Sequence, residues 1–260
     1  MGGCANNGVK EIHVGALSGK VAIVTGASRG IGRAVALMFA REGAAVTLVA
    51  PPHTGLEVMV EFLQAEGHRV HAAPTDVARE ADVNRMVQTT LDAFGRIDIL
   101  VNNAGVLYLR SLQDTPPEIW NTVLGVNLTG PFLCCQAVVP HMRAVGGGSI
   151  INVTSNAGRA GFANESAYCA SKWGLEGLTQ ALALELQADN IAVNSLVPGV
   201  ATAPTGPEGH YDEATRALAH DPLDIAPGFV YLAQQTARTM TGKMLDAWEL
   251  TQQVRTLHHA

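Results

Sequence analysis

The sequence has few cysteines, little basic charge and no long hydrophobic run, and each shortage removes a class of protein. Its balance of 17 Lys and Arg against 23 Asp and Glu gives a net charge of −6, whereas nucleic-acid-binding domains usually carry a basic face. The cysteines have neither metal-ligand spacing nor the pattern of a disulfide framework, so we expect small buried side chains and no metal. They are Cys4, Cys134, Cys135 and Cys169.

The hydrophobic runs are too short for a membrane protein. Runs such as Val21–Val24 and Ile97–Val101 fall far below the ~20 residues that cross a bilayer as a helix. The first residues, MGGCANNGVKEIHVGALSGK, are polar and lack the apolar stretch of a secretory signal. We therefore expect a cytoplasmic protein with no membrane partner, preceded by a flexible lead-in over residues 1–17.

What the sequence does contain is an alternation of short Val-, Ile- and Leu-rich runs with longer helical patterns. Nearly continuous apolar runs are typical of parallel strands covered on both faces, and their alternation with helices indicates βαβ units. The prediction is a single-domain α/β fold: a Rossmann-type doubly wound parallel sheet of about seven strands with helices on both faces. The predicted strands are Lys20–Thr25, Ala45–Ala50, Arg69–Thr75, Asp98–Asn102, Ser149–Thr154, Ala192–Val197 and Lys243–Ala247, and the predicted helices are Ile31–Glu42, Gly55–Glu66, Arg79–Phe94, Pro117–Arg143 and Asn164–Ala188.

One segment, residues 198–227, interrupts this alternation. It begins with dense Pro and Gly, PGVATAPTGP, and contains a candidate short helix over Asp212–His220. Because ligands of open α/β sheets bind beyond the carboxyl ends of the strands, we interpret it as a substrate loop or lid. The chain is accordingly divided into the lead-in, a domain over residues 18–250 and a C-terminal tail over residues 251–260.

The first predicted strand continues directly into TGASRGIG, Thr25 to Gly32. Its glycines permit a tight turn and close approach of the backbone to a pyrophosphate. The helix that follows offers unpaired N–H groups and the positive end of its dipole to that anion. A dinucleotide site of this kind requires a strand before the turn and a helix after it, and both are predicted here. The alternative is a tight strand-to-helix turn that binds no ligand.

Tyr168 and Lys172 stand four residues apart in SAYCASKWGLEGL, and Ser155 precedes Tyr168 by thirteen residues. On a helix, residues i and i+4 share a face. A phenol, an ammonium and a hydroxyl brought together can move a proton to or from a substrate oxygen. The pattern therefore indicates chemistry at a carbonyl or an alcohol.

These motifs together resemble the short-chain dehydrogenase/reductase family, and the resemblance extends from about Ser18 to about Asp246. It implies a catalytic set of Asn127, in VNLTGPF, with Ser155, Tyr168 and Lys172. It also implies cofactor contacts from the glycine turn, from the pair after the third strand, from NNAG after the fourth, from the catalytic pair and from the PG turn. These contacts are Gly26, Ser28, Arg29, Gly30, Ile31, Gly32, Asp76, Val77, Asn103, Ala104, Gly105, Tyr168, Lys172, Pro198 and Gly199.

The activity implied is that of a short-chain alcohol dehydrogenase or ketoreductase, which interconverts a carbonyl and a secondary alcohol with Tyr168 as general acid/base. An ammonium ~4 Å from a phenolate contributes up to about 4 kcal/mol at an effective dielectric near 20, enough to bring a phenol's pKa from about 10 toward about 7. Asn127 lies beside Gly125 and Gly130-Pro131, a weak helix interior, which predicts a kink whose free carbonyl holds a proton-relay water. A non-catalytic redox sensor and a lyase or epimerase on the same fold stay open as alternatives.

The end of the second predicted strand bears on the choice of cofactor. An acid there would bind the ribose hydroxyls of NAD, but the sequence reads TLVAPPHT, with Ala50 at that position and Pro51 after it. Family relatives with a basic residue at the position of Arg29 use NADP, so NADP(H) is favoured, assisted by His53, and NAD(H) is the alternative.

The candidate pocket residues suit a small neutral carbonyl or alcohol substrate, and the alternative is an anionic group recognised by Arg110 or Arg159. They are largely apolar: Leu107–Leu109, Arg159, Phe162, Ala201–Thr205, His210 and Tyr211. Helices over 117–143 and 164–188 have more than one apolar face, which suits a subunit contact. The family resemblance implies a homodimer or homotetramer through these helices, and a monomer with broadly buried helices is the alternative. Two departures from the family pattern stand near the end: Thr202 comes one residue early, and Ala247-Trp248 replaces a Gly-Gly.

Overall fold

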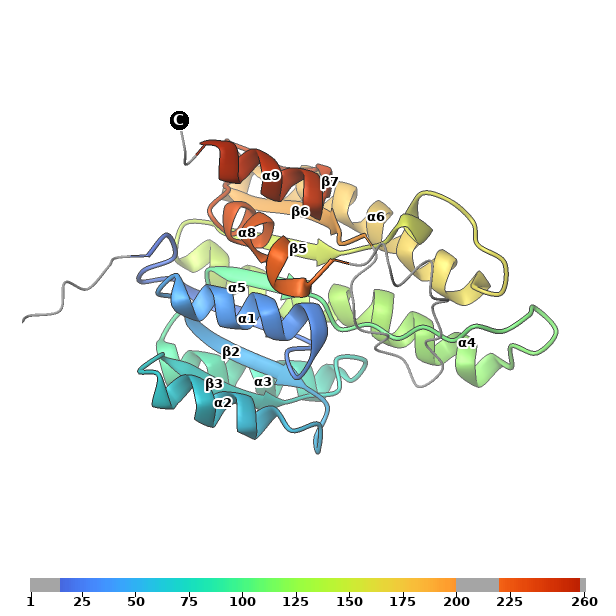
Figure 1. Ribbon diagram of the computed structural model, residues 1–260, viewed down its shortest axis with the longest axis horizontal. Coiled ribbons are helices and arrows are strands. Elements are labelled where there is room, and N and C mark those ends of the chain that lie inside the picture. The colour runs from blue at the N-terminus through green and yellow to red at the C-terminus, as the bar shows by residue number, and fades with distance from the viewer. Residues whose placement is uncertain (1–14, 200–219, 258–260) are drawn as a thin grey trace, which may run out of the picture.

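The computed structural model describes residues 15–199 and 220–257, which form a parallel sheet between two layers of helices (Figure 1). The sheet order within these residues is β3-β2-β1-β4-β5-β6-β7, and each neighbouring pair is parallel. The direction of winding reverses between β1 and β4, which is where open α/β sheets bind ligands. The strands are β1 (Val21–Thr25), β2 (Ala45–Ala50), β3 (Val70–Pro74), β4 (Ile99–Asn102), β5 (Gly148–Val153), β6 (Ile191–Val197) and β7 (Met244–Asp246).

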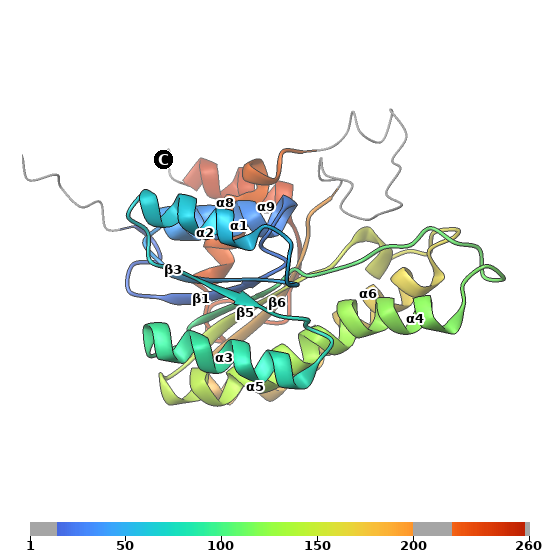
Figure 2. The same cartoon turned by 90° about the horizontal axis from the view of Figure 1, so that it is seen from below.

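Two sets of helices bury the two faces of the sheet, as Figure 2 shows edge-on. One face is covered by α1 (Gly30–Arg41), α2 (Leu56–Ala65), α8 (Pro222–Ala233) and α9 (Ala247–Leu257). The opposite face is covered by α3 (Glu80–Phe94), α5 (Gly130–Ala144) and α6 (Ser166–Glu185), with α4 (Pro117–Leu124) beyond the sheet. Every residue of β1, β2, β4 and β6 is therefore buried, and the predicted fold class is confirmed.

The predicted domain limits need three corrections. Leu17, placed in the flexible lead-in, is only 1% exposed because it packs into the core. The predicted loop ends too late, since residues 222–227 already form the first half of α8, which Asp221 caps by accepting a hydrogen bond from the Leu223 N–H. The predicted tail is helical through Leu257, and Val254 packs against the core.

The stretch predicted as one kinked helix, residues 117–143, is α4 and α5 joined by a π-helical turn, η1 (Gly125–Thr129). The Gly130 N–H donates to the Gly125 carbonyl, five residues back, so the predicted irregularity is confirmed. By length and composition this stretch, Pro117–Ala144, is the one candidate membrane span among the described residues. It packs against α3, α6 and β4, as a core helix does.

Candidate active site

The predicted catalytic and cofactor residues lie at one edge of the sheet, beyond the carboxyl ends of β1, β4, β5 and β6. Parallel strands end at the same edge, so residues far apart in sequence are brought together there. The turn after β1, the NNAG segment after β4, Ser155 after β5 and Pro198 after β6 meet in this way.

The glycine turn after β1 has the geometry that its sequence predicts. Gly26 and Gly30 have φ of 68° and 54°, in the left-handed region that glycine adopts without strain. A Cβ on Gly32 would collide with the Gly26 carbonyl, so α1 can approach the turn only with glycine there. Ser28, Arg29 and Ile31 occupy the same turn and the start of α1.

The NNAG segment supports this turn from the side. The Asn103 side-chain amide donates to the Thr25 carbonyl at 2.8 Å, and the Thr25 hydroxyl accepts from the backbone N–H groups of Asn103 and Ala104 at 2.9 and 3.0 Å. Thr25, which the sequence reading did not single out, thus joins β1 to β4. The side chain of Asn103, predicted as a cofactor contact, is engaged in shaping the turn.

Asp76 and Val77 lie beyond β3 and have different surroundings. Asp76 Oδ1 accepts from the Ala78 N–H at 3.0 Å, which fixes the backbone after the strand. Val77 is 6% exposed and packs so closely on Gly130 that a Cβ there would approach its Cγ2 to 2.9 Å. Val77 therefore connects the predicted adenine side of the site to the π-turn.

Asn127 is fully buried inside η1 and holds the loop after β4. Its Oδ1 accepts from the Val106 N–H at 2.8 Å, and its Nδ2 donates to the Val106 carbonyl at 2.9 Å. The same Nδ2 donates to Ser171 Oγ at 3.2 Å, and Ser171 donates in turn to the Tyr168 carbonyl at 2.7 Å. The amide thus fixes the distance between the loop after β4 and the helix that carries Tyr168.

Tyr168 and Lys172 share a face of α6, as their spacing predicts. Lys172 Nζ lies 5.5 Å from the centroid of the Tyr168 ring and donates to the Val153 carbonyl, at the end of β5, at 2.9 Å. Ser155, two residues beyond Val153, begins the short helix η2 (Asn156–Gly158), and its Oγ accepts from the Ala157 N–H at 3.2 Å. Phenol, ammonium and hydroxyl therefore gather at the end of β5.

Lys172 is the buried charge of this site, with 4% of its surface exposed. Burial lowers the pKa of Lys172 from 10.5 to about 8, because a desolvated ammonium is costly, while the nearby carboxylate of Glu176 raises the pKa. A lysine in this state can lose and regain a proton near neutral pH, which suits a group that takes part in proton transfer.

The segment after β2 contains no acidic side chain, as its sequence requires. Ala50 is buried at the end of β2, and residues 51–55 are exposed. His53 has a φ of 63°, and the Thr54 hydroxyl donates to the Pro51 carbonyl at 2.7 Å, so this is an ordered turn. Arg29 is exposed at the N-cap position of α1.

Several predicted pocket residues lie outside the described part of the chain. These are Ala201–Thr205, with Thr202, and His210 and Tyr211, as well as the candidate helix over Asp212–His220 except for its last residue. Pro198 is buried, and Gly199 has a φ of 69°. Trp248, at the start of α9, stacks on His220 with ring centroids 4.0 Å apart and planes at 6°.

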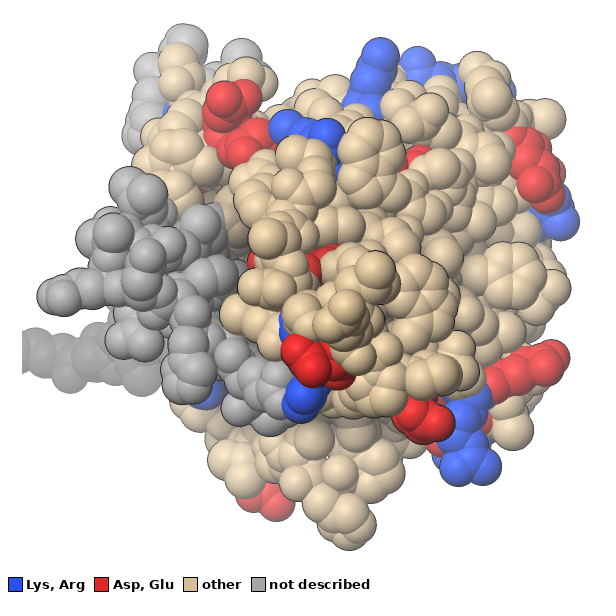
Figure 3. All heavy atoms as spheres, turned by 90° about the vertical axis from the view of Figure 1, so that its right-hand side faces the viewer, with Lys and Arg blue, Asp and Glu red and all other residues tan. Residues whose placement is uncertain are grey.

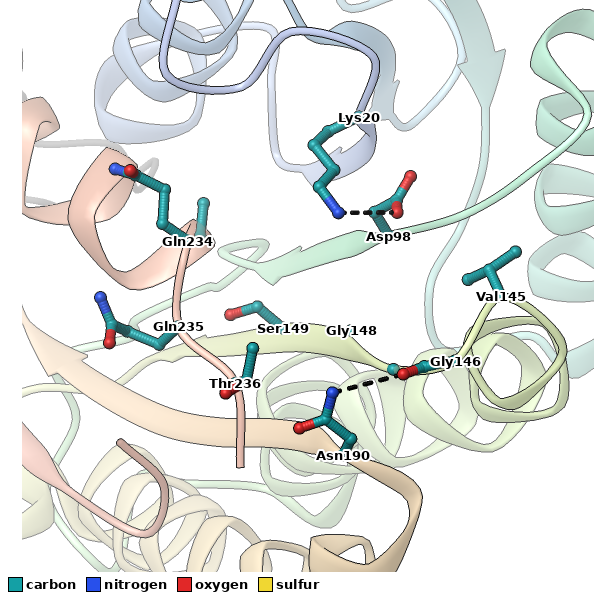
Figure 4. Close-up of a pocket in the computed structure, with 12 residues that line it drawn as sticks. Lys20, Asp98, Val145, Gly146, Gly148, Ser149, Asn190, Gln234, Gln235 and Thr236 are labelled. Carbon is teal, nitrogen blue, oxygen red and sulfur yellow. Dashed lines mark hydrogen bonds and ion pairs between the residues drawn. The ribbon is translucent and has the colours of Figure 1, made fainter. Parts of the chain in front are cut away.

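A pocket of about 130 Å³ lies at the opposite edge of the sheet (Figure 4). Lys20, Asp98, Gly148 and Asn190 line it, and each stands at or just before the amino end of a strand. Asp98 is paired with Lys20 and Arg96 and accepts the Val21 N–H. These bonds fix the strand starts, and the predicted catalytic residues are at the other edge.

The sequence resembles known proteins along most of its length. It matches the short chain dehydrogenase family over residues 20–212. It is 38% identical over 236 residues to the (2S)-[(R)-hydroxy(phenyl)methyl]succinyl-CoA dehydrogenase subunit BbsD of Thauera aromatica, covering 88% of this chain and 95% of that one. It is 36% identical to the D-threitol dehydrogenase of Mycolicibacterium smegmatis, covering 87% and 90%. A structure of a short chain dehydrogenase from Shigella flexneri complexed with NADP superimposes with a TM-score of 0.83 at 30% identity, covering 90% and 99%.

Proposed function

Because the chain belongs to the short-chain dehydrogenase/reductase family of oxidoreductases, we propose that it interconverts a carbonyl and a secondary alcohol with NADP(H). The observation that carries this proposal is the buried Lys172 beside Tyr168, held at the end of β5 next to Ser155. A buried ammonium next to a phenol is costly for a fold to maintain and is suited to proton transfer at a substrate oxygen.

The residues around the glycine turn fit a dinucleotide. Arg29 contributes no side-chain cap to α1, and the first turn of α1 contains no acidic residue. The backbone N–H groups at the start of α1 therefore suit an anion such as a pyrophosphate. Gly26, Gly30 and Gly32 would approach that pyrophosphate with their backbone, and Lys172 would hold the nicotinamide ribose. When bound, the cofactor supplies or accepts the hydride.

The side chains of the site have separate roles in proton transfer and in positioning the substrate. Tyr168 donates its proton to the carbonyl oxygen during reduction and accepts it back during oxidation. Lys172 favours the phenolate through its charge. Ser155 accepts a hydrogen bond from the Ala157 N–H, which leaves its own O–H to orient the substrate oxygen. Asn127 holds the Val106 loop beside them.

A neutral substrate is supported by the surface around the site. Figure 3 views the molecule from the right-hand side of Figure 1, the end where α4 and the loop before α6 lie; most of this surface is uncharged, and its charged side chains form separate groups of both signs. Leu109 and Phe162, both predicted pocket residues, are 39% and 47% exposed on the loops that lead to the site. We propose a small, neutral, partly apolar carbonyl or alcohol.

The activity is tested by following NADPH and NADH absorbance at 340 nm with a panel of ketones and secondary alcohols. We expect turnover by the wild-type protein and a loss of about 10²–10⁴-fold in Tyr168→Phe, the range for removal of a general acid/base. Nucleotide binding without turnover across the panel would instead favour the redox sensor. Full activity of Tyr168→Phe would exclude the proposed mechanism.

The preference for NADP(H) rests on Arg29 and on the missing acid after β2. We expect Arg29→Ala to weaken NADPH binding about tenfold or more, since a charged hydrogen bond to a phosphate contributes about 1.5–3 kcal/mol, and to leave NADH binding unchanged. Arg33→Ala, an exposed arginine on the same helix, is the matched control. Tighter binding of NADH than of NADPH by the wild type would overturn the assignment.

We also propose that the protein is a cytoplasmic homodimer or homotetramer assembled through α4, α5 and α6. Large apolar side chains on these helices are exposed: Trp120 by 37%, Phe132 by 45%, Trp173 by 53% and Leu184 by 78%. Exposed apolar groups of this size on neighbouring helices mark contact surfaces. Light scattering after size exclusion should give a multiple of 27.3 kDa, and a monomer at micromolar concentration would contradict the proposal.

A further inference from the structure

Glu176 is a second buried charge on the helix that carries Tyr168 and Lys172. It follows Lys172 by four residues and Tyr168 by eight, so the three side chains lie along one face of α6. Only 4% of Glu176 is exposed. Acidic side chains are almost never buried this deeply unless they are paired, so its presence behind the catalytic pair needs a physical reason.

The contacts of Glu176 show a carboxylate that is held but incompletely satisfied. Its Oε2 accepts a hydrogen bond from the Ser195 hydroxyl, on β6, at 2.7 Å. Within the described residues its Oε1 is buried without a hydrogen-bond partner. Gly158 closes over this turn of the helix, since a Cβ there would lie 3.1 Å from the Lys172 carbonyl and 3.3 Å from Glu176 Cγ.

The ammonium of Lys172 has few other charged neighbours. Around it, among the described residues, stand the Val153 carbonyl of β5, Asn127 of η1, Gly105 after β4, and Tyr168 and Glu176 on its own helix. Of these, only Tyr168 and Glu176 ionise. A desolvated ammonium tends to lose its proton, and the charge that opposes this loss is the carboxylate of Glu176.

We propose that Glu176 is a positioning residue whose buried negative charge keeps Lys172 protonated, and that Ser195 holds this charge in place. The role rests on the proposed function, because a charged Lys172 matters through its effect on Tyr168. It predicts that the pH range of activity depends on Glu176, although Glu176 touches neither the substrate nor the cofactor.

The direction of the effect follows from electrostatics. Tyr168 and Lys172 lose two protons in coupled steps, and a neighbouring negative charge favours retention of both. Glu176→Gln removes this charge but keeps the side-chain shape and a partner for Ser195. Both limbs of the pH profile of kcat/KM for alcohol oxidation should therefore move to lower pH. Because Glu176 is nearer to Lys172 than to Tyr168, its removal should lower the pKa of Lys172 more than that of Tyr168. The fraction of the enzyme that has a charged Lys172 and an ionised Tyr168 together should therefore also fall.

The experiment compares pH profiles of kcat/KM from pH 6 to 10 for the wild type, Glu176→Gln and Glu176→Asp. We expect Glu176→Gln to lose activity by about tenfold or more on the alkaline limb, which corresponds to a tenfold change in a protonation equilibrium, and Glu176→Asp to restore most of it. Glu185→Gln makes the same chemical change at an exposed position of α6 and should leave the profile unchanged. A Glu176→Gln profile that superimposes on the wild type would overturn the proposal.

A measurement on the wild-type protein keeps the proposal testable if Glu176→Gln does not fold. The ¹⁵N resonance of Lys172 Nζ should show a charged ammonium at pH 7, and a neutral amine would overturn the proposal, since Glu176 would then not keep Lys172 protonated. A wild-type protein that binds nucleotide but turns over no substrate would contradict the proposed oxidoreductase function, but not the electrostatic effect of Glu176 on Lys172. An active wild type with an insensitive Glu176→Gln would count against Glu176 alone.

Discussion

Lys172 should make the protein less stable at neutral pH, and the size of this cost can be worked out from its burial. The pKa of Lys172 is lowered from 10.5 to about 8, and each tenfold difference in proton affinity corresponds to about 1.4 kcal/mol, so folding a charged Lys172 costs about 3 kcal/mol. A group whose pKa is lowered by folding destabilises the protein below that pKa. The cost is then relieved as pH rises toward the unfolded value.

Lys172→Met removes the charge and most of the polarity while keeping a long apolar stem. It also removes the donor to the Val153 carbonyl, at a cost of about 1 kcal/mol. At pH 7 the variant should therefore be more stable than the wild type by about 2 kcal/mol, the difference between these two terms. Near pH 10.5, the wild-type lysine is neutral in the folded state and about half protonated in the unfolded state, so little of the cost remains and the variant should be slightly less stable.

Urea unfolding of both proteins without nucleotide, at pH 7 and pH 10.5 and one protein concentration, measures this change. The predicted result is a reversal in the order of stability, accompanied by complete loss of activity. Lys243→Met, at an exposed lysine, is the control for general effects of alkaline pH and should show no reversal. A stability difference between Lys172→Met and the wild type that stays constant across this pH range would refute the reasoning.

Three further outcomes follow from contacts in the site. Asn127→Ala should lower the free energy of unfolding by about 2 kcal/mol or more, because both backbone groups of Val106 lose their partner, as urea unfolding would measure. Gly32→Ala should weaken nucleotide binding strongly, since its Cβ would collide with the glycine turn, as calorimetry would show. Burial raises the pKa of Cys135 to about 12, so mass spectrometry should find this thiol unalkylated at pH 8 until the protein unfolds.

The sequence predicts the sheet well because its strands are short, apolar and separated by helical patterns. All seven predicted strands exist, with ends displaced by a few residues at most. The errors fall where the local pattern and the packing disagree. Residues 222–227 contain two prolines, which favour a loop locally, but Pro222 stands in the first turn of α8, where a missing N–H costs nothing.

The placement of Tyr168 and Lys172 is also predictable, because helical spacing alone puts them on one face of α6. The supporting contacts are harder to read. The Thr25 hydroxyl accepts from backbone N–H groups after β4, and the Ser171 hydroxyl accepts from the Asn127 side chain of η1. No pattern in the sequence gives these partners. Glu176 is only partly predictable. Its spacing from Lys172 can be seen in the sequence, but its burial depends on Ser195 and Gly158, which only the fold brings close to it.

The face of α6 that carries Tyr168, Lys172 and Glu176 explains why the charge at Lys172 survives in the fold. A buried ammonium without a neighbouring opposite charge would lose its proton, because the neutral amine avoids the desolvation penalty of the charged form. A direct ion pair with Glu176 would stabilise the charge. It would also occupy N–H donors of Lys172 that the proposed function assigns to the nicotinamide ribose. Instead Lys172 extends to Val153 and Glu176 extends to Ser195, so the carboxylate acts through space. In the proposed role, the carboxylate favours the charged form of Lys172 without taking the place of the Val153 carbonyl as its hydrogen-bond acceptor.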